Sequence, residues 1–326
     1  MSSSSTTSIP AFGELEAHRR ELAAHCYRML GSPFEAEDAV QDTLLRAWRS
    51  IDRFEGRASV RSWLYRIATN VCLDMLEGRK RRARPMDLGP AVAPIESNLQ
   101  QFPDEDWVQP IPDTLVATEG DPAEVIVRRE SIRLAFVAAL QHLPPRQRAA
   151  LILCEVLQWR AAEAAELLGM TVAGVNSALQ RARATLAERE LSSSGPAATL
   201  EAADRQILDR YVAAFERYDM DRLAEVIHED ATQSMPPFSL WLQGRDDILS
   251  WFVGPGNGCR GSRLIPTANA NGLPAFGQYK PNPDGGHLPW ALHTVEMDRG
   301  GAVELTFFLD TATLFPLFGL PEHLDG

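Results

Sequence analysis

The sequence has few cysteines and lacks long apolar runs, and each of these absences excludes a class of protein. Its 326 residues include four cysteines, which lie far apart and form no C-x-x-C pair. We therefore expect neither a disulfide framework nor a zinc site. No apolar run approaches the roughly 18 residues that a membrane helix needs. These absences predict a soluble protein of a reducing compartment, the cytoplasm, with no membrane partner.

The chain also lacks the basic surplus that nucleic-acid-binding proteins usually carry. It has 32 Lys and Arg against 44 Asp and Glu, a formal net charge of −12. The acidity is segregated, however. Residues 46–84 hold 11 basic and 4 acidic side chains, whereas residues 85–127 hold 9 acids and no base. Residues 191–326 hold 9 basic and 18 acidic side chains. The net charge therefore does not exclude DNA binding by the basic block.

Periodicity and composition divide the chain into six segments. The N-terminus is rich in Ser and Thr and lacks the charged and apolar stretches of a secretion signal, which predicts a disordered tail. Two stretches have apolar residues at helical steps of three and four, and the segment between them has seven prolines and no period. The predicted segments are a tail at 1–10, helices at 11–84, an acidic Pro-rich linker at 85–127, helices at 128–190, a short linker at 191–200 and an α+β domain at 201–326.

The first helical stretch predicts two amphipathic helices, Glu35–Ile51 and Ala58–Glu77. Gly78 is suited to end the second helix, and a run of basic residues follows it. The polar side of the first helix mixes both charges around Leu45, a composition that suits a protein partner; a solvated helix face is the alternative.

The second helical stretch contains a helix-turn-helix pattern over Trp159–Leu186. Gly169 suits the tight turn, and Thr171 is a predicted N-cap of the second helix. That helix would present Asn, Gln and Arg to the major groove, where these residue types can pair with adenine, guanine or phosphate. A helical hairpin with a basic, solvated edge is the alternative.

Three segments of these helical stretches carry a family resemblance. They are AEDAVQDT at 36–43, WLYRIATNVCLD at 63–74, and LPPRQR at 143–148 followed by the helix-turn-helix. In this order they resemble the sigma-70 family of bacterial transcription initiation factors, in its extracytoplasmic-function branch. The first segment resembles the region 2 helix that binds core RNA polymerase, and the second resembles the part that reads and melts the minus-ten promoter element. The third resembles region 4, which reads the minus-thirty-five element.

The resemblance implies three binding surfaces. Melting DNA needs cations along the backbone and planar side chains that stack on bases, and the second segment contains both; a core position is the alternative for Trp63. The core polymerase-binding residues are Asp38, Gln41, Asp42, Leu45, Arg46 and Arg49. The minus-ten residues are Phe54, Arg57, Arg61, Tyr65, Arg66, Asn70, Asp74, Arg79, Lys80 and Arg81. The minus-thirty-five residues are Arg146, Arg148, Thr171, Asn176, Ser177, Gln180, Arg181 and Arg183. The resemblance also implies that the acidic linker threads through the polymerase cleft; a passive tether is the alternative.

Two segments of the C-terminal part carry a second resemblance, LAEVIHEDAT at 223–232 and GRDDI at 244–248. On these segments, residues 201–326 resemble the SnoaL-like polyketide cyclases of the NTF2-like superfamily. The resemblance implies a cone-shaped α+β domain with an apolar pocket for a small molecule. A regulatory loop is implied at Asp284, Gly285 and Gly286. The titratable candidates for proton transfer are His228, Asp230, His293 and Glu296, for which capping or core positions are the alternative.

The sequence therefore predicts two all-α domains and a C-terminal NTF2-like cone, forming a sigma factor with a fused regulatory domain and no catalytic site, cofactor or metal. The expected partners are core RNA polymerase, promoter DNA, a small-molecule ligand and an anti-sigma factor. Two rivals remain open. One is a helix-turn-helix regulator that acts without polymerase, and the other is an NTF2-like isomerase or cyclase with appended DNA-binding segments.

Overall fold

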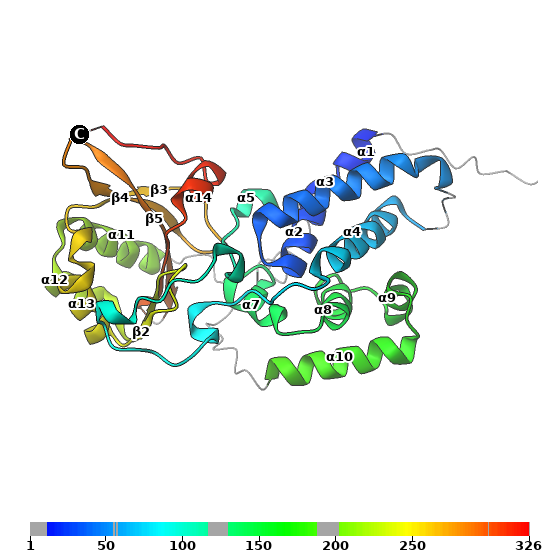
Figure 1. The fold of residues 1–326 in the computed structure, drawn as a ribbon, viewed down its shortest axis with the longest axis horizontal. Coiled ribbons are helices and arrows are strands. Elements are labelled where there is room, and N and C mark those ends of the chain that lie inside the picture. The colour runs from blue at the N-terminus through cyan, green and yellow to red at the C-terminus, as the bar shows by residue number, and fades with distance from the viewer. Residues whose placement is uncertain are drawn as a thin grey trace, which may run out of the picture. The chain divides into compact units, whose positions relative to one another are not determined.

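Contacts within the chain divide it into two units (Figure 1). The computed structural model describes residues 12–54, 56, 58–116, 130–187, 202–298 and 300–325. Unit 1 comprises residues 1–81, 108–111 and 115–192, and unit 2 comprises residues 82–107, 112–114 and 193–326. Among the described residues, no helix is both long enough and apolar enough to cross a lipid bilayer.

Unit 1 is helical. Its first part contains α1 (Phe12–Glu16), α2 (Arg19–Leu30), α3 (Pro33–Arg49) and α4 (Val60–Leu76). Helix α3 begins two residues earlier than the spacing of its apolar residues predicts, because Ser32 caps it by accepting a hydrogen bond from the Glu35 amide at 3.4 Å. Gly31 ends α2 in the left-handed conformation, with φ 74°. A 3-10 turn at Ile51–Arg53 follows α3.

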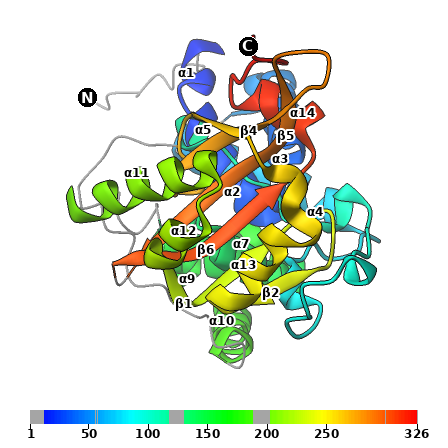
Figure 2. The ribbon, with the colours of Figure 1, turned by 90° about the vertical axis from the view of Figure 1, so that its left-hand side faces the viewer.

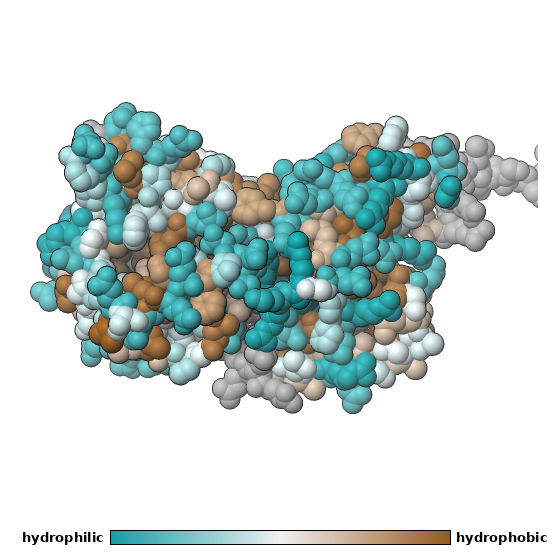
Figure 3. All heavy atoms as spheres, in the orientation of Figure 1, coloured by the Kyte–Doolittle hydropathy of each residue, from teal (hydrophilic) through white to brown (hydrophobic). Residues whose placement is uncertain are grey.

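The second part of unit 1 contains the predicted helix-turn-helix. Its helices are α7 (Leu134–Gln141), α8 (Pro145–Leu151), which continues as a π-helical turn at Ile152–Val156, α9 (Ala161–Leu168) and α10 (Val172–Ala187). Gly169 ends α9 with φ 61°, and Thr171 caps α10 by accepting a hydrogen bond from the Gly174 amide at 3.0 Å. Both parts share one hydrophobic core, in which Met29 of α2 and Leu151 of α8 are buried. The outer surface of this unit that faces the viewer is mainly hydrophilic (Figure 3).

Unit 2 is an α+β domain. It has helices α11 (Ala202–Arg217), α12 (Met220–Val226), α13 (Arg245–Val253) and α14 (Thr311–Leu317), and a 3-10 turn at Pro255–Cys259. Its strands are β1 (Ile227–Ser234), β2 (Trp241–Gln243), β3 (Arg263–Pro266), β4 (Ala275–Pro281), β5 (His287–Asp298) and β6 (Gly301–Phe308). They form one mixed sheet in the order β2-β1-β6-β5-β4-β3, in which only the β1 and β6 pair is parallel.

One face of this sheet is covered by α11, α12 and α13, which lie in front of the strands in Figure 2. Phe215 of α11 and Phe252 of α13 pack against Phe307 of β6, with ring centroids 6.2 and 6.4 Å from it. Apolar burial between helices and sheet thus forms the core of unit 2. The predicted fold class, helical domains followed by an α+β domain, is confirmed.

Most of the described part of the acidic linker, residues 85–107 and 112–114, belongs to unit 2, whereas residues 108–111 and 115–116 belong to unit 1 and bury Val108, Ile111 and Val116 in its core. The linker is largely irregular, as predicted, with 3-10 turns at Pro85–Asp87, Glu96–Asn98 and Asp104–Asp106, but it also contains the short helix α5 (Asp113–Val116). Its backbone pairs with the residues before and within the edge strand β2: Val92 donates to the Trp241 carbonyl at 3.1 Å, and Ser239 donates to the Gln100 carbonyl at 2.9 Å. The Trp241 indole also donates to the Gly89 carbonyl at 2.9 Å. The part of the linker before residue 108 therefore belongs to unit 2 and is not a free tether. Residues 117–129 lie outside the described residues.

Candidate nucleic-acid interface

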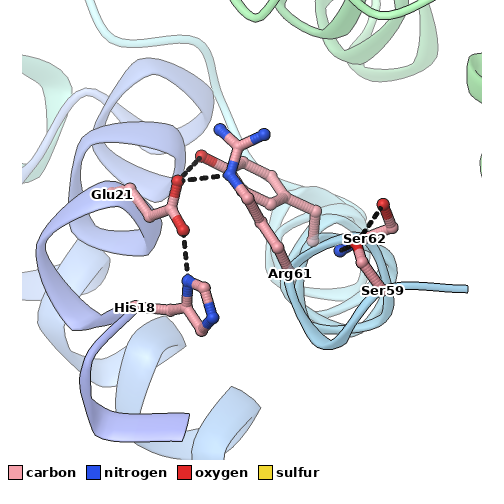
Figure 4. Close-up of polar contacts among 6 residues, drawn as sticks. His18, Glu21, Ser59, Arg61 and Ser62 are labelled. Carbon is pink, nitrogen blue, oxygen red and sulfur yellow. Dashed lines mark hydrogen bonds and ion pairs between the residues drawn. The ribbon is translucent and has the colours of Figure 1, made fainter. Parts of the chain in front are cut away.

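The first turn of α4 carries a network of polar contacts (Figure 4). Ser59 caps the helix by accepting a hydrogen bond from the Ser62 amide at 3.1 Å. Two residues into the helix, Arg61 Nε donates to Glu21 Oε2 at 2.7 Å, and the Tyr65 hydroxyl donates to the same oxygen at 3.3 Å. The other oxygen of Glu21 contacts Nδ1 of His18. Glu21 thus connects α2 to the first two turns of α4.

Two aromatic residues predicted for DNA melting lie in different surroundings. Tyr65 is buried, with its ring 5.1 Å from that of His25 and 5.6 Å from that of Trp159, and burial raises the pKa of its hydroxyl. It therefore cannot stack on a base in this conformation. Phe54 is half-buried and packs on Trp63, with a centroid distance of 5.0 Å, so this pair has partly accessible rings. Arg57 lies outside the described residues.

The polar face of α4 is largely engaged in ion pairs within unit 1. Arg66 pairs with Glu166 of α9 at 2.7 Å, and Asp74 pairs with Arg46 of α3 at 3.3 Å. Asn70, between them on this face, is exposed. The two ion pairs join exposed groups and are each worth up to about 1 kcal/mol, so DNA phosphates can compete for Arg66.

The basic run after α4 divides between two environments. Arg79, Lys80 and Arg81 are exposed. Arg79 pairs with Glu35, and Arg81 bonds to His142. In contrast, Arg82 is buried and donates to the Trp107 carbonyl at 2.8 Å. Arg79, Lys80 and Arg81 are therefore accessible to DNA, whereas Arg82, which belongs to the same predicted phosphate-binding run, is not.

The outer face of α3 combines the predicted charged residues with apolar side chains. Asp38, Gln41, Leu45, Arg46 and Arg49 are exposed, and Asp42 is half-buried and pairs with Arg46 at 2.8 Å. Leu45 is 46% exposed. This mixture of an accessible apolar side chain and charges resembles the composition of protein interfaces.

The same face contains an apolar residue, Trp48, that the sequence pattern does not predict to be exposed. The apolar spacing of the helix at 35–51 predicts that Trp48 lies on its buried stripe, but Trp48 is 50% exposed and stands edge-on to Phe12, with a centroid distance of 5.7 Å. Its position one residue after buried Ala47 puts it at the margin of the stripe, which is the signal that could have identified it.

The exposed face of α10 brings together most of the predicted minus-thirty-five residues. Thr171, Asn176, Ser177, Gln180, Arg181 and Arg183 are all exposed, and Arg183 pairs with Glu155. Val175, Ala178, Leu179 and Ala182 are buried on the opposite side. The helix therefore rests on unit 1 by its apolar face and leaves its polar face free to contact a groove.

The two arginines before α10 differ in accessibility. Arg146 is exposed, whereas Arg148 is only 3% exposed. Its guanidinium donates to Gln141 Oε1 at 2.7 Å, to the Leu143 carbonyl at 3.2 Å and to the Met29 carbonyl. Burial lowers the pKa of Arg148 to about 10. DNA contact by Arg148 would require it to leave these acceptors.

The titratable residues of unit 2 do not converge on one site. His293 is fully buried, stacks on Phe307 at 4.0 Å, and has its nitrogens 2.9 Å from the Tyr211 hydroxyl and 3.2 Å from the Thr306 carbonyl. Burial lowers its pKa to about 3, so it is neutral at pH 7. Glu296, three residues along the same strand, points to the opposite face of the sheet. His228 accepts from the Asp230 amide at 3.2 Å at the start of β1.

The predicted regulatory loop is the tip of the β4–β5 hairpin. Asn282 closes the turn by donating to the Gly286 carbonyl at 2.9 Å and accepting from the Gly285 amide at 2.9 Å. Asp284 is exposed. Gly285 and Gly286 have φ of 105° and 69°, values that favour glycine. Within the described residues, no cluster of three His, Cys, Asp or Glu side chains is placed to hold a metal ion.

Comparisons with known proteins agree with this division. Three family models match the chain: Sigma-70 region 2 over residues 15–82, Sigma-70 region 4 over residues 133–186, and a SnoaL-like domain over residues 208–267. The ECF RNA polymerase sigma factor SigG of Mycobacterium tuberculosis H37Rv is 46% identical over 316 residues, which cover 95% of this chain and 83% of that protein. The ECF RNA polymerase sigma factor SigJ of the same strain is 29% identical over 285 residues, covering 82% of this chain and 83% of SigJ.

A solved structure shares the fold. The crystal structure of the Mycobacterium tuberculosis extracytoplasmic function sigma factor SigJ has a TM-score of 0.61 at 23% sequence identity. The match covers 95% of this chain and 100% of that one. The order of helical parts and NTF2-like domain is therefore common to both chains.

Proposed function

This chain belongs to the extracytoplasmic-function RNA polymerase sigma factors, and from that premise we propose which of its surfaces bind core polymerase and the two promoter elements. The observation that carries the assignment is similarity along almost the whole chain to a sigma factor, with regions 2 and 4 both matched and in order. As a sigma factor, the protein binds core RNA polymerase and directs promoter-specific transcription initiation. We infer that it works in the cytoplasm, where promoter DNA and polymerase are found.

We assign core polymerase binding to the outer face of α3. Leu45 supplies accessible apolar area, and Trp48, beside it on the same helix, extends that area. Asp38, Gln41, Arg46 and Arg49 would surround it with polar groups that give specificity. An apolar centre inside a polar rim is the usual anatomy of an energetic protein contact.

We assign the minus-ten element to the polar face of α4, which includes Arg66 and Asn70, and to Arg79, Lys80 and Arg81. The Phe54–Trp63 pair lies at the start of this surface and offers rings on which an unstacked base could rest. The exposed cations would attract the backbone of the melted strand. Arg66 would exchange Glu166 for phosphate when DNA binds.

We assign the minus-thirty-five element to α10. Asn176 and Gln180 lie one helical turn apart on the exposed face, a spacing that lets both reach base edges in a major groove. Arg181 and Arg146 would contact phosphates and set the register of the helix.

For unit 2 we propose a modulatory role. The linker joins regions 2 and 4 along the chain, and its described part forms backbone hydrogen bonds with β2 and with Ser239, which precedes it. An event that breaks or strengthens these hydrogen bonds would therefore change how freely regions 2 and 4 can move during promoter binding. The hairpin tip at Asp284–Gly286 is exposed and available to a protein contact. A catalytic role is disfavoured because His293 is fully buried, stacks on the rings of Phe215 and Phe307, and has its pKa lowered to about 3 by this burial.

The assignment is tested by transcription of genomic fragments with core polymerase and the full-length protein. We expect transcripts that begin at discrete positions and disappear when Leu45→Glu blocks core binding. Tight duplex binding without specific initiation would support the polymerase-independent regulator instead. Turnover of a ligand that is lost in His293→Gln would support the enzyme.

A further inference from the structure

Glu21 lies outside every predicted binding surface, yet it contacts the first two turns of the minus-ten helix (Figure 4). It stands in the first turn of α2, where the helix dipole favours a carboxylate. Its side chain is 17% exposed, whereas that of its partner Arg61 is 36% exposed. A carboxylate beside a surface that binds DNA would repel the phosphates unless its charge is paired, so the partners of Glu21 need an explanation.

The contacts of Glu21 fix the position of the Arg61 side chain. Oε2 accepts from Arg61 Nε at 2.7 Å and from the Tyr65 hydroxyl at 3.3 Å, while Oε1 is held by His18. The Arg61 guanidinium carbon also lies 5.0 Å from the centroid of the Tyr65 ring. A long, flexible side chain is thereby restrained by an ion pair at Nε and by an aromatic face.

This arrangement leaves the other end of the guanidinium for a ligand. Figure 4 shows both terminal nitrogens of Arg61 directed away from Glu21. Paired terminal nitrogens are the group with which arginine binds a phosphate in bidentate geometry. Arg61 lies in the first turn of α4, two residues after the Ser59 cap, so a phosphate that it binds would lie at the N-terminal end of this helix.

We propose that Glu21 is a positioning residue that holds Arg61 against Tyr65 and so presents its terminal nitrogens to a backbone phosphate of the melted minus-ten strand. The proposal rests on the proposed minus-ten surface. Restraining the side chain before DNA arrives reduces the ordering cost of binding, which is how preorganisation raises affinity. The proposal differs from simple charge repulsion, in which Glu21 would only weaken DNA binding.

The test measures promoter melting by the full-length protein with core polymerase. The promoter is the genomic fragment that the wild-type holoenzyme transcribes most strongly, and the readout is permanganate reactivity of unpaired thymines around the minus-ten element. The variants are Glu21→Ala, Glu21→Gln, Arg61→Ala and the double variant Glu21→Ala with Arg61→Ala. Glu229→Gln, on the exposed start of β1, removes the same charge elsewhere and is the control.

We expect Glu21→Ala and Arg61→Ala each to reduce melting roughly tenfold, the usual scale for a charge-assisted hydrogen bond. The double variant should melt no less than Arg61→Ala alone, because the two residues act through one contact. Glu21→Gln keeps an oxygen acceptor for Arg61 and should restore part of the activity. The affinity of each variant for core polymerase and the Tm of its own unfolding should remain those of the wild type. If Glu21 only stabilised the fold, its loss would lower the Tm of the protein.

Each other outcome overturns the proposal at a different step. If the wild-type holoenzyme melts no fragment, the proposed function fails, and the role of Glu21 fails with it. If Arg61→Ala melts DNA like the wild type, the assignment of Arg61 is wrong. Three further outcomes, each with a defective Arg61→Ala, would refute only the positioning role of Glu21. The Glu21 variants could melt DNA as the wild type does, they could melt more DNA than the wild type, or the double variant could melt less DNA than Arg61→Ala alone.

Discussion

Replacing Arg148 with Ala should destabilise unit 1 without directly removing a DNA contact. The guanidinium is buried and donates to Gln141 Oε1, the Gln141 and Leu143 carbonyls, and the Met29 carbonyl. A buried acceptor left unpaired costs about 1–3 kcal/mol, and water entering the vacated space satisfies part of the set. We therefore expect a loss of about 3–5 kcal/mol in the free energy of unfolding, which corresponds to about 6–20 °C in Tm for a unit of this size.

The matched control is Arg146→Ala, two residues earlier in the same helix and exposed. It should change stability by less than about 0.5 kcal/mol. It should instead weaken binding to minus-thirty-five DNA. The slope of the logarithm of the affinity against the logarithm of the salt concentration should become shallower by about one, the value for one lost phosphate contact. Differential scanning calorimetry and DNA titrations at several salt concentrations measure both effects. If Arg148→Ala kept the wild-type Tm and lost DNA affinity as Arg146→Ala does, the burial argument would be refuted.

Three further predictions address the other surfaces. Leu45→Glu should weaken core polymerase affinity at least roughly tenfold in a competition assay while Tm stays constant, because it places a charge at the apolar centre of an exposed contact; an unchanged affinity would exclude this face. Gln180→Ala should lower affinity for the preferred minus-thirty-five base by about 1–3 kcal/mol and relax preference at that position alone in a selection from randomised DNA; a uniform loss across all sequences would reassign Gln180 to the backbone. The pKa of His293 is about 3 in the folded chain and about 6.5 in the unfolded chain. Below pH 6.5 the unfolded chain therefore binds the proton preferentially. The free energy of unfolding should fall between pH 6.5 and pH 3 by up to about 1.4 kcal/mol per pH unit. Urea unfolding of unit 2 at pH 7 and pH 5 should show this loss in the wild type and a smaller one in His293→Gln, and equal losses would contradict the assignment.

Helix positions and exposed faces could be predicted from local patterns. The cap at Thr171, the turn at Gly169 and the buried side of α10 all depend on residues within a few positions of one another. Of the predicted charged positions on α3, Asp38, Arg46 and Arg49 are exposed for the same reason, since amphipathic spacing determines which side of a helix meets the core, while Asp42 is half-buried.

Long-range contacts could not be predicted in this way. Arg148 has the residue type and the neighbours of a phosphate-binding arginine, but its acceptors include Met29, which lies more than a hundred residues earlier. The linker has the composition of a tether, yet Val92 and Gln100 pair with residues near β2 that follow them by well over a hundred positions. Glu21 carries no local signal of its contacts with α4, because a carboxylate in the first turn of a helix is already favoured by the helix dipole.

The central claim, that α4 and α10 read two promoter elements within one polymerase complex, is tested most directly by site-specific crosslinking. A photoreactive amino acid at exposed Asn70 or Gln180 is incorporated into the full-length protein, which is then bound to core polymerase on a promoter that it transcribes. We predict that Asn70 crosslinks to the minus-ten element and Gln180 to the minus-thirty-five element of the same promoter, and that both crosslinks require core polymerase. Crosslinks scattered along the duplex, or of equal yield without core polymerase, would contradict the account.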